Sequence, residues 1–579
     1  MKLEYYVFLE ESAVSDGFSD ESDIELPSSD VSISSSEELD DIIRENEDGD
    51  AGERVHNLED WKWTQTDNVP NNMRCIIDGE LNSVVARRLG ENPGKAEVLG
   101  EFQTDEFWEL VKNETNANAV KCLRNIESNP TKKKTYDEEN WFPVTKDELK
   151  AHFALCILMS QTKKSSVQEY WTKRRVRETP IFSETMSHRC FSIISRYLHF
   201  APDSPETQCD KLWKVRPVLQ LLLDKFQKLY VPGKRISIDE SLMKFRGRLA
   251  FVQFNPSKRA RFGIKFYKVC CSDTSYCWKF RIYVGKEPQH VDGTGDARRL
   301  LCSEAIVLEL CDELLGSCRT IYMDNWYSSP TLFRELIMKN TNAIGTVHPN
   351  RKLMPPHFAA TNLKKGELTF ASANGILATK WVDKKNVHLL STVHQRPDFA
   401  ETKSKRGKLV LKPNMVVDYN SGMGGVDSHD QRLASYPLMR RYAKGYKKIY
   451  FYVFDMAMQN ASVVHHMLNP GKRRPSFSSF RVDVAEQILE GVVLPDYRTR
   501  GRPSAGSTPT RLQERHWGHF PTKIPPTTKK VIPSRRCKVC VTRGLRKESS
   551  FECHRCKVAM HEYDSFMTYH IQKDFTKYI

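Results

Sequence analysis

Between about residue 100 and Pro232, apolar side chains recur with the three-to-four-residue period of amphipathic helices. The clearest segment is TKDELKAHFALCILMSQ, residues 145–161, in which Thr145 and Glu148 have the spacing of a capping box. This pattern predicts that a helix begins at that point. The same period predicts further helices over residues 106–126, 190–200 and 213–232.

From residue 234 onward the apolar period changes to two, which is typical of β-strands. Alternating β-branched and aromatic residues occupy KRISIDESLMKFRGR, LAFVQFNP, GIKFYKVCCSD and YCWKFRIYVG, and turn residues separate these strings. An antiparallel meander is therefore expected. After the meander, the pattern predicts a helix, a short apolar strand that ends at Asp324, and another helix. Short strands are predicted over residues 353–414, and helices again over residues 424–467. The mixture of periods predicts a multidomain α/β protein.

The length of 579 residues suggests roughly four domains, at about 150 residues each. No apolar run approaches the roughly 18 residues needed to cross a bilayer, and the first residues lack a signal-peptide pattern. Neither secretion nor membrane insertion is expected.

Charge is distributed unevenly along the chain. Residues 1–60 contain 20 Asp and Glu against three Lys and Arg, whereas residues 61–579 contain 85 Lys and Arg against 53 Asp and Glu. A body this basic favours polyanionic partners, nucleic acid first among them, although charge alone is also compatible with an ordinary soluble protein. The acidic segment is poor in apolar residues and is predicted to be disordered.

Acidic residues stand at the ends of several predicted elements. Asp239 lies on the first strand of the meander, Asp324 ends a short strand, and Asp427 and Asp430 share one face at a helix start. Carboxylates that converge from two strands and a helix can hold a pair of Mg²⁺ ions, which clamp both oxygens of a phosphoryl displacement. A single Asp of this kind is more often a strand-end or N-cap residue, so spacing alone leaves both interpretations open.

The C-terminal tail contains two CxxC pairs and two downstream histidines: Cys537, Cys540, Cys553, Cys556, His561 and His570. Thiolate and imidazole are the ligands that zinc prefers, and this spacing is typical of zinc sites. The other eleven cysteines show no framework spacing, so reduced thiols are expected. Six ligands complete one four-ligand site and leave two over, which predicts one or two structural zinc ions.

Five strings occur in one order along the chain: ISIDESLMKFRGR, NPSKRARFGIK, YMDNWYSSPTLF, AIGTVHPNR and NSGMGGVDSHDQ. In this order they resemble the piggyBac family of DNA transposases and the host proteins derived from it. Upstream, WFPVTKDELKAHFALCILMSQ and MSHRCFSIISRYLHF resemble the helical region of that family. The resemblance covers roughly residues 100–465 and the tail.

The resemblance implies an RNase H-like catalytic core with a β-rich insertion, a flanking helical DNA-binding domain and a C-terminal Cys/His zinc domain. The domains expected on this basis are an acidic disordered region (1–95), a first helical DNA-binding and dimerisation part (96–233), the catalytic core (234–352), the insertion (353–414), the final catalytic segment (415–436), a second helical part (437–497), a basic linker (498–533) and the zinc domain (534–579).

The resemblance also implies an activity. The family's catalytic aspartates fall on Asp239, Asp324 and Asp427, and a further functionally important aspartate falls on Asp430. Family enzymes use Mg²⁺ to nick transposon ends, form a hairpin through the freed 3′-OH and join the element at TTAA. The expected function is thus a cut-and-paste DNA transposase that uses two Mg²⁺ ions. Its expected partner is double-stranded DNA (terminal repeats and TTAA target), and the family implies a homodimer. The nucleus is the expected location, and the basic runs 403–408 and 471–475 are compatible with nuclear import signals or with solvated loops.

The sequence departs from the family pattern in two places. Members often have Trp after the last catalytic aspartate, where this chain has Lys444-Gly445-Tyr446; in the tail, His561 and Ser565 stand where cysteines are usual. One zinc site is therefore predicted to lack a protein ligand. Two alternatives stay open: a transposase-derived nuclear DNA-binding protein that does not cut DNA, and an interaction protein whose tail binds other proteins. Terminal repeats and TTAA duplications around the gene would separate a transposase from a derivative.

Overall fold

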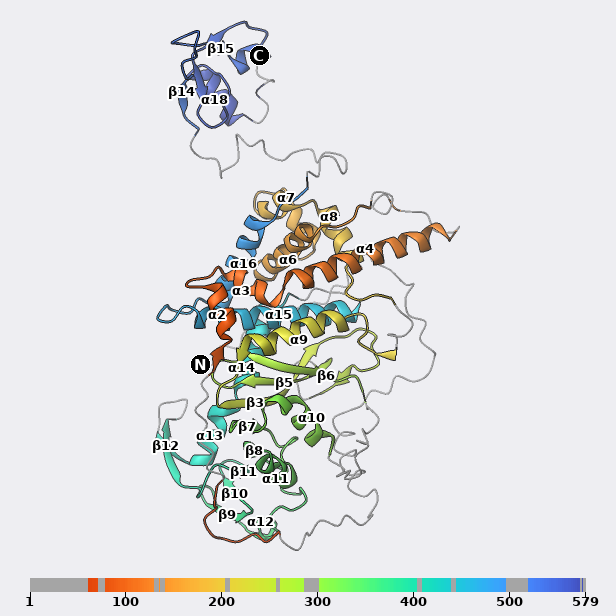
Figure 1. Cartoon of the computed structure of the whole chain (residues 1–579), viewed down its shortest axis with the longest axis vertical. Coiled ribbons are helices and arrows are strands. Elements are labelled where there is room, and N and C mark those ends of the chain that lie inside the picture. Colours follow the sequence, from red (N-terminus) through yellow and green to blue (C-terminus); the bar gives the residue numbers. More distant parts are fainter. Residues whose placement is uncertain are drawn as a thin grey trace, which may run out of the picture. The chain divides into compact units, whose positions relative to one another are not determined.

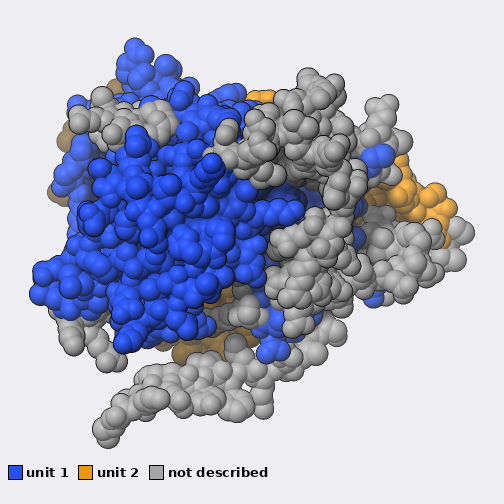
Figure 2. Space-filling model, turned by 90° about the horizontal axis from the view of Figure 1, so that it is seen from below, with its two compact units in different colours: residues 1–93, 203–474 blue, residues 94–202, 475–579 orange. Residues whose placement is uncertain are grey.

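A computed structural model describes residues 61–70, 79–129, 135, 141–203, 209–256, 261–285, 301–403, 409–438, 444–495, 519–572 and 575. They belong to two compact units, one drawn from residues 1–93 and 203–474 and the other from residues 94–202 and 475–579 (Figure 2). The predicted disordered segment 1–60 and much of the predicted linker lie outside the described residues.

A nine-stranded sheet forms the centre of the first unit (Figure 1). Its strands are β3 (Arg235–Lys244), β4 (Gln253–Phe254), β5 (Phe262–Cys271), β6 (Cys277–Ile282), β7 (Thr320–Met323), β8 (Asn342–Thr346), β9 (Leu368–Ala373), β10 (Ile376–Val382) and β11 (Asn386–Ser391). They are ordered β4-β5-β3-β7-β8-β11-β10-β9, and β6 also pairs with β5. β7 lies parallel to both β3 and β8, and the other pairings are antiparallel.

The antiparallel meander predicted from the period of two is the β3-β5-β6 part of this sheet. Three antiparallel strands extended by two parallel ones form the RNase H-like core that the resemblance implied. Parallel neighbours need crossover connections, which contain α10 (Cys302–Cys311) and η4 (Asp312–Leu314) before β7 and α11 (Pro330–Met338) before β8. The predicted insertion 353–414 supplies β9, β10 and β11, which continue the core sheet because β11 pairs with β8.

Among the described helices that pack with the sheet in the first unit are α9 (Arg216–Leu229), α14 (Gly425–Ser435) and α15 (Gly445–Met467). α14 contacts β3 and β5, and α9 contacts β6 and α15. Almost all of α15 is buried, and its Asn460 side chain is hydrogen-bonded to both the backbone N–H and the backbone C=O of Cys277 on β6. The sequence prediction grouped α9 and α15 with the helical domain, whereas here they cover the sheet, because their apolar faces bury against its strands.

The remaining elements of this unit are short. They are β1 (Glu80–Leu81), α2 (Ser83–Leu89), β2 (Tyr230–Val231), α12 (His357–Ala360), β12 (Phe399–Lys403), β13 (Leu409–Pro413) and α13 (Asn414–Gly422).

The second unit contains a helical part. Its elements are α3 (Lys95–Phe102), α4 (Asp105–Glu127), α6 (Lys146–Gln161), η2 (Gln168–Trp171), α7 (Pro180–Thr185), α8 (His188–Tyr197) and α16 (Phe477–Gly491). α6 begins with the predicted capping box: the hydroxyl of Thr145 accepts from the N–H of Glu148, and the Glu148 carboxylate accepts from the N–H of Thr145. α6 packs against α4, α8 and α16, which explains why it is apolar on nearly every side.

The same unit includes the C-terminal tail, whose elements are short: β14 (Pro521–Lys523), β15 (Arg535–Arg536), α17 (Lys538–Thr542), β16 (Glu548–Ser549), β17 (Phe551–Cys553) and α18 (Asp564–Ile571). β14 pairs with β17, and β15 with β16. The core of this segment consists of a few side chains around Cys537, Cys540, Cys553 and Met560. A core this small is rarely sufficient without a metal or disulfides. None of the described helices combines the length and the apolarity that a membrane span requires.

Candidate functional sites: a carboxylate cluster and two cysteine–histidine clusters

The strand register brings Asp239 and Asp324 together. β3 and β7 are parallel neighbours in which Ile238 pairs with Met323, and each aspartate is the next residue along its own strand. Two carboxylates 85 positions apart in the sequence therefore stand at the same level of adjacent strands. The N–H of Trp326 donates to Asp324 Oδ1 over 3.0 Å and holds that carboxylate at the strand end.

Glu240 completes a cluster of three carboxylates. One oxygen from each of Asp239, Glu240 and Asp324 lies within 4.8 Å of the others. Burial and then the charges of Glu240 and Asp324 raise the pKa of Asp239 to about 7. Burial and the charge of Glu240 raise the pKa of Asp324 to about 6. Mutual repulsion of this kind is relieved by a cation, so the cluster suits a hard divalent ion.

Asp427 lies in the first turn of α14, where a negative charge is also favoured by the helix dipole. Its charge contributes to the raised pKa of Asp239, which places it near the cluster. Among the described residues, however, the group within 4.8 Å contains Glu240 rather than Asp427. The proposed metal-binding role of Asp427 stays a prediction. Sequence reasoning missed Glu240, whose only signal was its position beside Asp239.

Asp430 points to a different partner. Its Oδ1 lies 2.6 Å from Nζ of Lys268 on β5, and the same ammonium donates to the hydroxyl of Tyr452 over 2.8 Å. The Lys268 side chain is completely buried. Asp430 is thus the counter-ion of a buried lysine, and its predicted catalytic role remains untested by this geometry.

An aromatic and cationic surface adjoins Asp324. The rings of Tyr267 and Trp326 stack with centroids 5.8 Å apart and planes at 13°. The ammonium of Lys265 lies 4.9 Å from the Tyr267 centroid and 4.7 Å from the Trp326 centroid, and its charge counteracts the raised pKa of Asp324. Aromatic faces and a cation beside carboxylates are the groups expected to hold a nucleic-acid strand.

Gly445 departs from the family pattern. It is the first residue of α15, and neighbouring side chains leave little room for a side chain at this position. A Cβ atom there would lie 2.4 Å from Leu249 Cδ1 and 3.1 Å from Phe245 Cζ. A tryptophan would not fit unless the side chains of Leu249 and Phe245, which follow β3, moved aside. The neighbouring Tyr446 is partly exposed, and its ring centroid lies 5.8 Å from the ammonium of Lys214.

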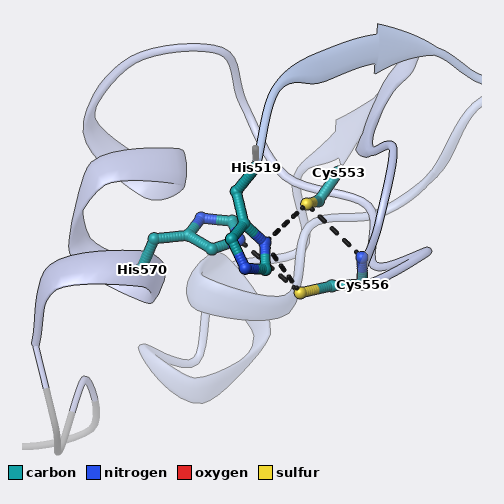
Figure 3. Close-up of side chains that lie close together, drawn as sticks. All are labelled: His519, Cys553, Cys556 and His570. Atoms are coloured by element: carbon teal, nitrogen blue, oxygen red, sulfur yellow. Dashed lines mark hydrogen bonds between the residues drawn. The ribbon is translucent and has the colours of Figure 1, made fainter. Parts of the chain in front are cut away.

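A complete four-ligand cluster lies in the tail, formed by His519, Cys553, Cys556 and His570. Figure 3 shows both imidazole rings facing the two sulfurs. His519 Nδ1 lies 3.3 Å from each Sγ, and His570 Nε2 lies 3.7 Å from Sγ of Cys556. With Zn–S near 2.3 Å and Zn–N near 2.0 Å, the ligands of a tetrahedral site stand about 3.5 Å apart, so the cluster fits zinc.

The surroundings of this cluster orient its ligands. His570 Nδ1 lies 2.8 Å from the carbonyl oxygen of Phe566, and this hydrogen bond orients Nε2 toward the sulfur of Cys556. His519 was missed in the sequence because it precedes Cys553 by 34 residues, inside the predicted linker. Pairing of Pro521 in β14 with Cys553 in β17 brings it into place.

A second cluster contains three potential ligands among the described residues of the tail: Cys537, Cys540 and His561. His561 Nδ1 lies 3.6 Å from Sγ of Cys540 and 3.4 Å from the hydroxyl of Ser565. Burial raises the pKa of the Cys537 thiol, but the Ser565 hydroxyl and backbone N–H groups lower it to about 7 overall. Ser565 occupies the side where a fourth ligand would stand, so the predicted shortage of one ligand falls on this cluster.

Comparisons with known proteins show what the chain resembles in sequence and in fold. The family model described as Transposase IS4 matches residues 96–462. The human PiggyBac transposable element-derived protein 3 is 26% identical over 478 residues, which cover 80% of this chain and 74% of that protein. The human PiggyBac transposable element-derived protein 2 is 26% identical over 357 residues, or 58% of each. The cryo-EM structure of a piggyBac transposase synaptic complex with hairpin DNA matches with a TM-score of 0.62 and 21% identity, covering 83% of this chain and 97% of that one.

Proposed function

This chain belongs to the piggyBac family of transposases and transposase-derived proteins, and we propose that it is a DNA-cutting and DNA-joining enzyme whose active site is the carboxylate cluster. The juxtaposition of Asp239 and Asp324 by parallel strand register carries this proposal. Burial and the charge of Glu240 raise the pKa values of these two carboxylates to about 7 and about 6, so they are arranged for a cation rather than for an ion pair.

Mg²⁺ fits this donor set because hard cations take oxygen ligands. Asp239 and Asp324, joined by Asp427 from α14, would hold it. The ion, when bound, would activate the attacking oxygen and stabilise the charge of a phosphoryl displacement. The carboxylates themselves bind and orient. With its pKa at about 7, Asp239 is protonated in part at neutral pH in the metal-free protein, so cation binding releases a proton.

The DNA substrate would lie along the Trp326 and Lys265 side of the cluster. The solved piggyBac transposase of similar fold is a complex with hairpin DNA, and the basic body of this chain suits the same kind of partner. Trp326, backed by the buried ring of Tyr267, would support an unpaired base, while Lys265 would contact phosphate and keep the strand end over Asp324. Terminal repeats as the bound sequence, TTAA as the target, a homodimer as the working form and the nucleus as the location belong to the same proposal.

The tail would recognise DNA ends as a zinc-dependent fold. We assign one tightly held zinc ion to the cluster of His519, Cys553, Cys556 and His570, and a weaker ion to the cluster of Cys537, Cys540 and His561. The ions would tie β14, β17 and α18 into one body that the short elements alone would not hold together.

A derivative that binds DNA without cutting it is the second candidate. The closed environment of Gly445 favours it, because a ring able to stack on a strand end cannot occupy that position. The relatives described as transposable element-derived proteins favour it as well.

The test uses the purified chain and linear DNA carrying the sequences that flank its own gene, with Mg²⁺ or Mn²⁺. A transposase nicks at the element boundary next to TTAA, and Asp239→Asn and Asp324→Asn abolish the product while DNA binding persists. Binding without nicking in the unaltered chain would instead establish the non-cutting derivative. Nicking that survives in both variants would show that the cluster is not the active site.

A further inference from the structure

Lys268 stands directly opposite Asp239 in the sheet. β3 and β5 are antiparallel, and their register pairs Asp239 with Lys268. Directly opposite residues of antiparallel strands project to the same face, with Cβ atoms about 5 Å apart. A lysine side chain therefore starts beside the carboxylate at the centre of the proposed active site. An ammonium group on Asp239 would compete with a divalent cation for its oxygens.

The ammonium of Lys268 is held elsewhere. It contacts Asp430 of α14 at 2.6 Å and the hydroxyl of Tyr452 of α15 at 2.8 Å, and it lies 4.8 Å from the centroid of the Tyr452 ring. α14 packs on both β3 and β5, so Asp430 reaches the lysine from the helix that also carries Asp427. The two helices together supply the partners of the Lys268 ammonium: Asp430 comes from α14 and Tyr452 from α15.

The pair is asymmetric. Lys268 has no exposed side-chain surface, whereas 32% of the Asp430 side chain is exposed. Burial alone would raise the pKa of Asp430, but the charge and hydrogen bond of Lys268 bring it below its usual value. Burial would lower the pKa of Lys268, and Asp430 raises it above its usual value instead. Both groups stay charged, and the buried lysine is the partner that depends on the pair.

Removal of the Asp430 charge would leave a buried ammonium without its counter-ion. Such a group finds another anion or loses its proton, because an isolated buried charge is costly. Asp239 is the anion within reach, because the strand register places it directly opposite Lys268 on the same face of the sheet. A lysine that turned to Asp239 would neutralise the carboxylate that the metal needs.

We propose that Asp430 is a positioning residue that holds the ammonium of Lys268 away from Asp239 and so keeps Asp239 open to a divalent cation. This inference rests on the proposed function, because it assumes that the carboxylate cluster binds a metal. It assigns Asp430 an indirect role, in place of direct metal binding or contact with DNA.

The test measures Mn²⁺ affinity of the full-length chain by electron paramagnetic resonance of the free ion, with Asp239→Asn defining the binding that belongs to the cluster. Asp430→Asn is expected to weaken this binding roughly 10-fold or more. The double variant Asp430→Asn with Lys268→Met is expected to restore it, because the competing ammonium is gone. Asp273→Asn is the matched control: Asp273 pairs with Arg235, the first residue of β3, and its loss is expected to leave Mn²⁺ affinity unchanged.

The outcomes distinguish a failure of this inference from a failure of the proposed metal site. If the double variant stays as weak as Asp430→Asn although its circular dichroism spectrum and melting temperature match those of the unaltered chain, Asp430 is itself a ligand and the inference is overturned. Unchanged Mn²⁺ affinity in Asp430→Asn would also overturn it. If the unaltered chain shows no Mn²⁺ binding that Asp239→Asn removes, the metal site of the proposed function fails, and this inference fails with it.

Discussion

His519 Nδ1 lies 3.3 Å from the sulfur of Cys553, a residue 34 positions further along the chain. The contact turns three recognisable zinc ligands of the tail into a complete set of four. It also changes the expectation for the tail, because the histidine lies in a segment predicted as a linker. The tail therefore extends at least to residue 519.

Replacement of His519 by alanine is expected to weaken the tightly held zinc ion. The cluster would keep Cys553, Cys556 and His570, and a zinc site that loses one of four protein ligands must take water instead. Zinc release to a chromogenic chelator should accelerate by about 10-fold or more. His554→Ala is the control, since His554 is exposed in the same segment and belongs to neither cluster. Equal release rates for both variants would exclude His519 as a ligand.

The replacement Ser565→Cys is expected to convert the weaker zinc site into a second tight one. The serine hydroxyl already lies 3.4 Å from His561 Nδ1, on the open side of the cluster with Cys537 and Cys540. Zinc release from the unaltered chain should be biphasic, and the fast phase should disappear in this variant. Ser565→Ala should keep the fast phase.

Two equally slow zinc ions in the unaltered chain would contradict this expectation. They would mean that a further residue supplies the fourth ligand.

The stability of the metal-free chain is expected to depend on pH through Asp239 and Asp324. Their folded-state pKa values, about 7 and about 6, lie above the usual value near 4 of an unfolded chain. Between these limits the folded state binds more protons than the unfolded state, so stability falls as pH rises from about 4 to about 7. Thermal melts over this range should show a shallower fall for Asp239→Asn.

Mg²⁺ should offset this loss of stability at higher pH, because the cation replaces the protons as the partner of the carboxylates. Melting temperatures near neutral pH should rise with Mg²⁺ in the unaltered chain and much less in Asp239→Asn. A rise of equal size in both proteins would place the ion elsewhere.

Introduction of the family's tryptophan at Gly445 is expected to destabilise the first unit. A Cβ atom at this position would lie 2.4 Å from Leu249 Cδ1, so the larger side chain must displace the side chains of Leu249 and Phe245 in the segment after β3. Overpacking of this kind costs about 1–3 kcal/mol, measurable as a lower midpoint of urea unfolding. Tyr446→Trp, at the partly exposed neighbouring position, should be tolerated. An unchanged midpoint of urea unfolding in Gly445→Trp would mean that the start of α15 can move.

Local sequence signals predicted local structure well. The capping box at Thr145 and Glu148 starts α6 as expected, and the period of two in RISIDES and GIKFYKV corresponds to β3 and β5. These signals depend on hydrogen bonds and side-chain directions within a few residues, which each segment carries in itself. The order of five family strings likewise identified the RNase H-like core before any tertiary contact was known.

Tertiary contacts determine which residues make up each site, and the local spacing of apolar residues does not predict those contacts. Asp239 and Asp324 were recognisable in the sequence, but Glu240 lies near both of them only because β3 and β7 are neighbours. Asp430 contacts Lys268, which is 162 residues away in the chain. His519 reached the cysteines through the pairing of β14 with β17. By itself, the sequence determined the strands, the helix starts and most of the chemistry-bearing residues. Only the tertiary structure decided which of those residues meet, because strand register and helix packing are set by burial of the whole core.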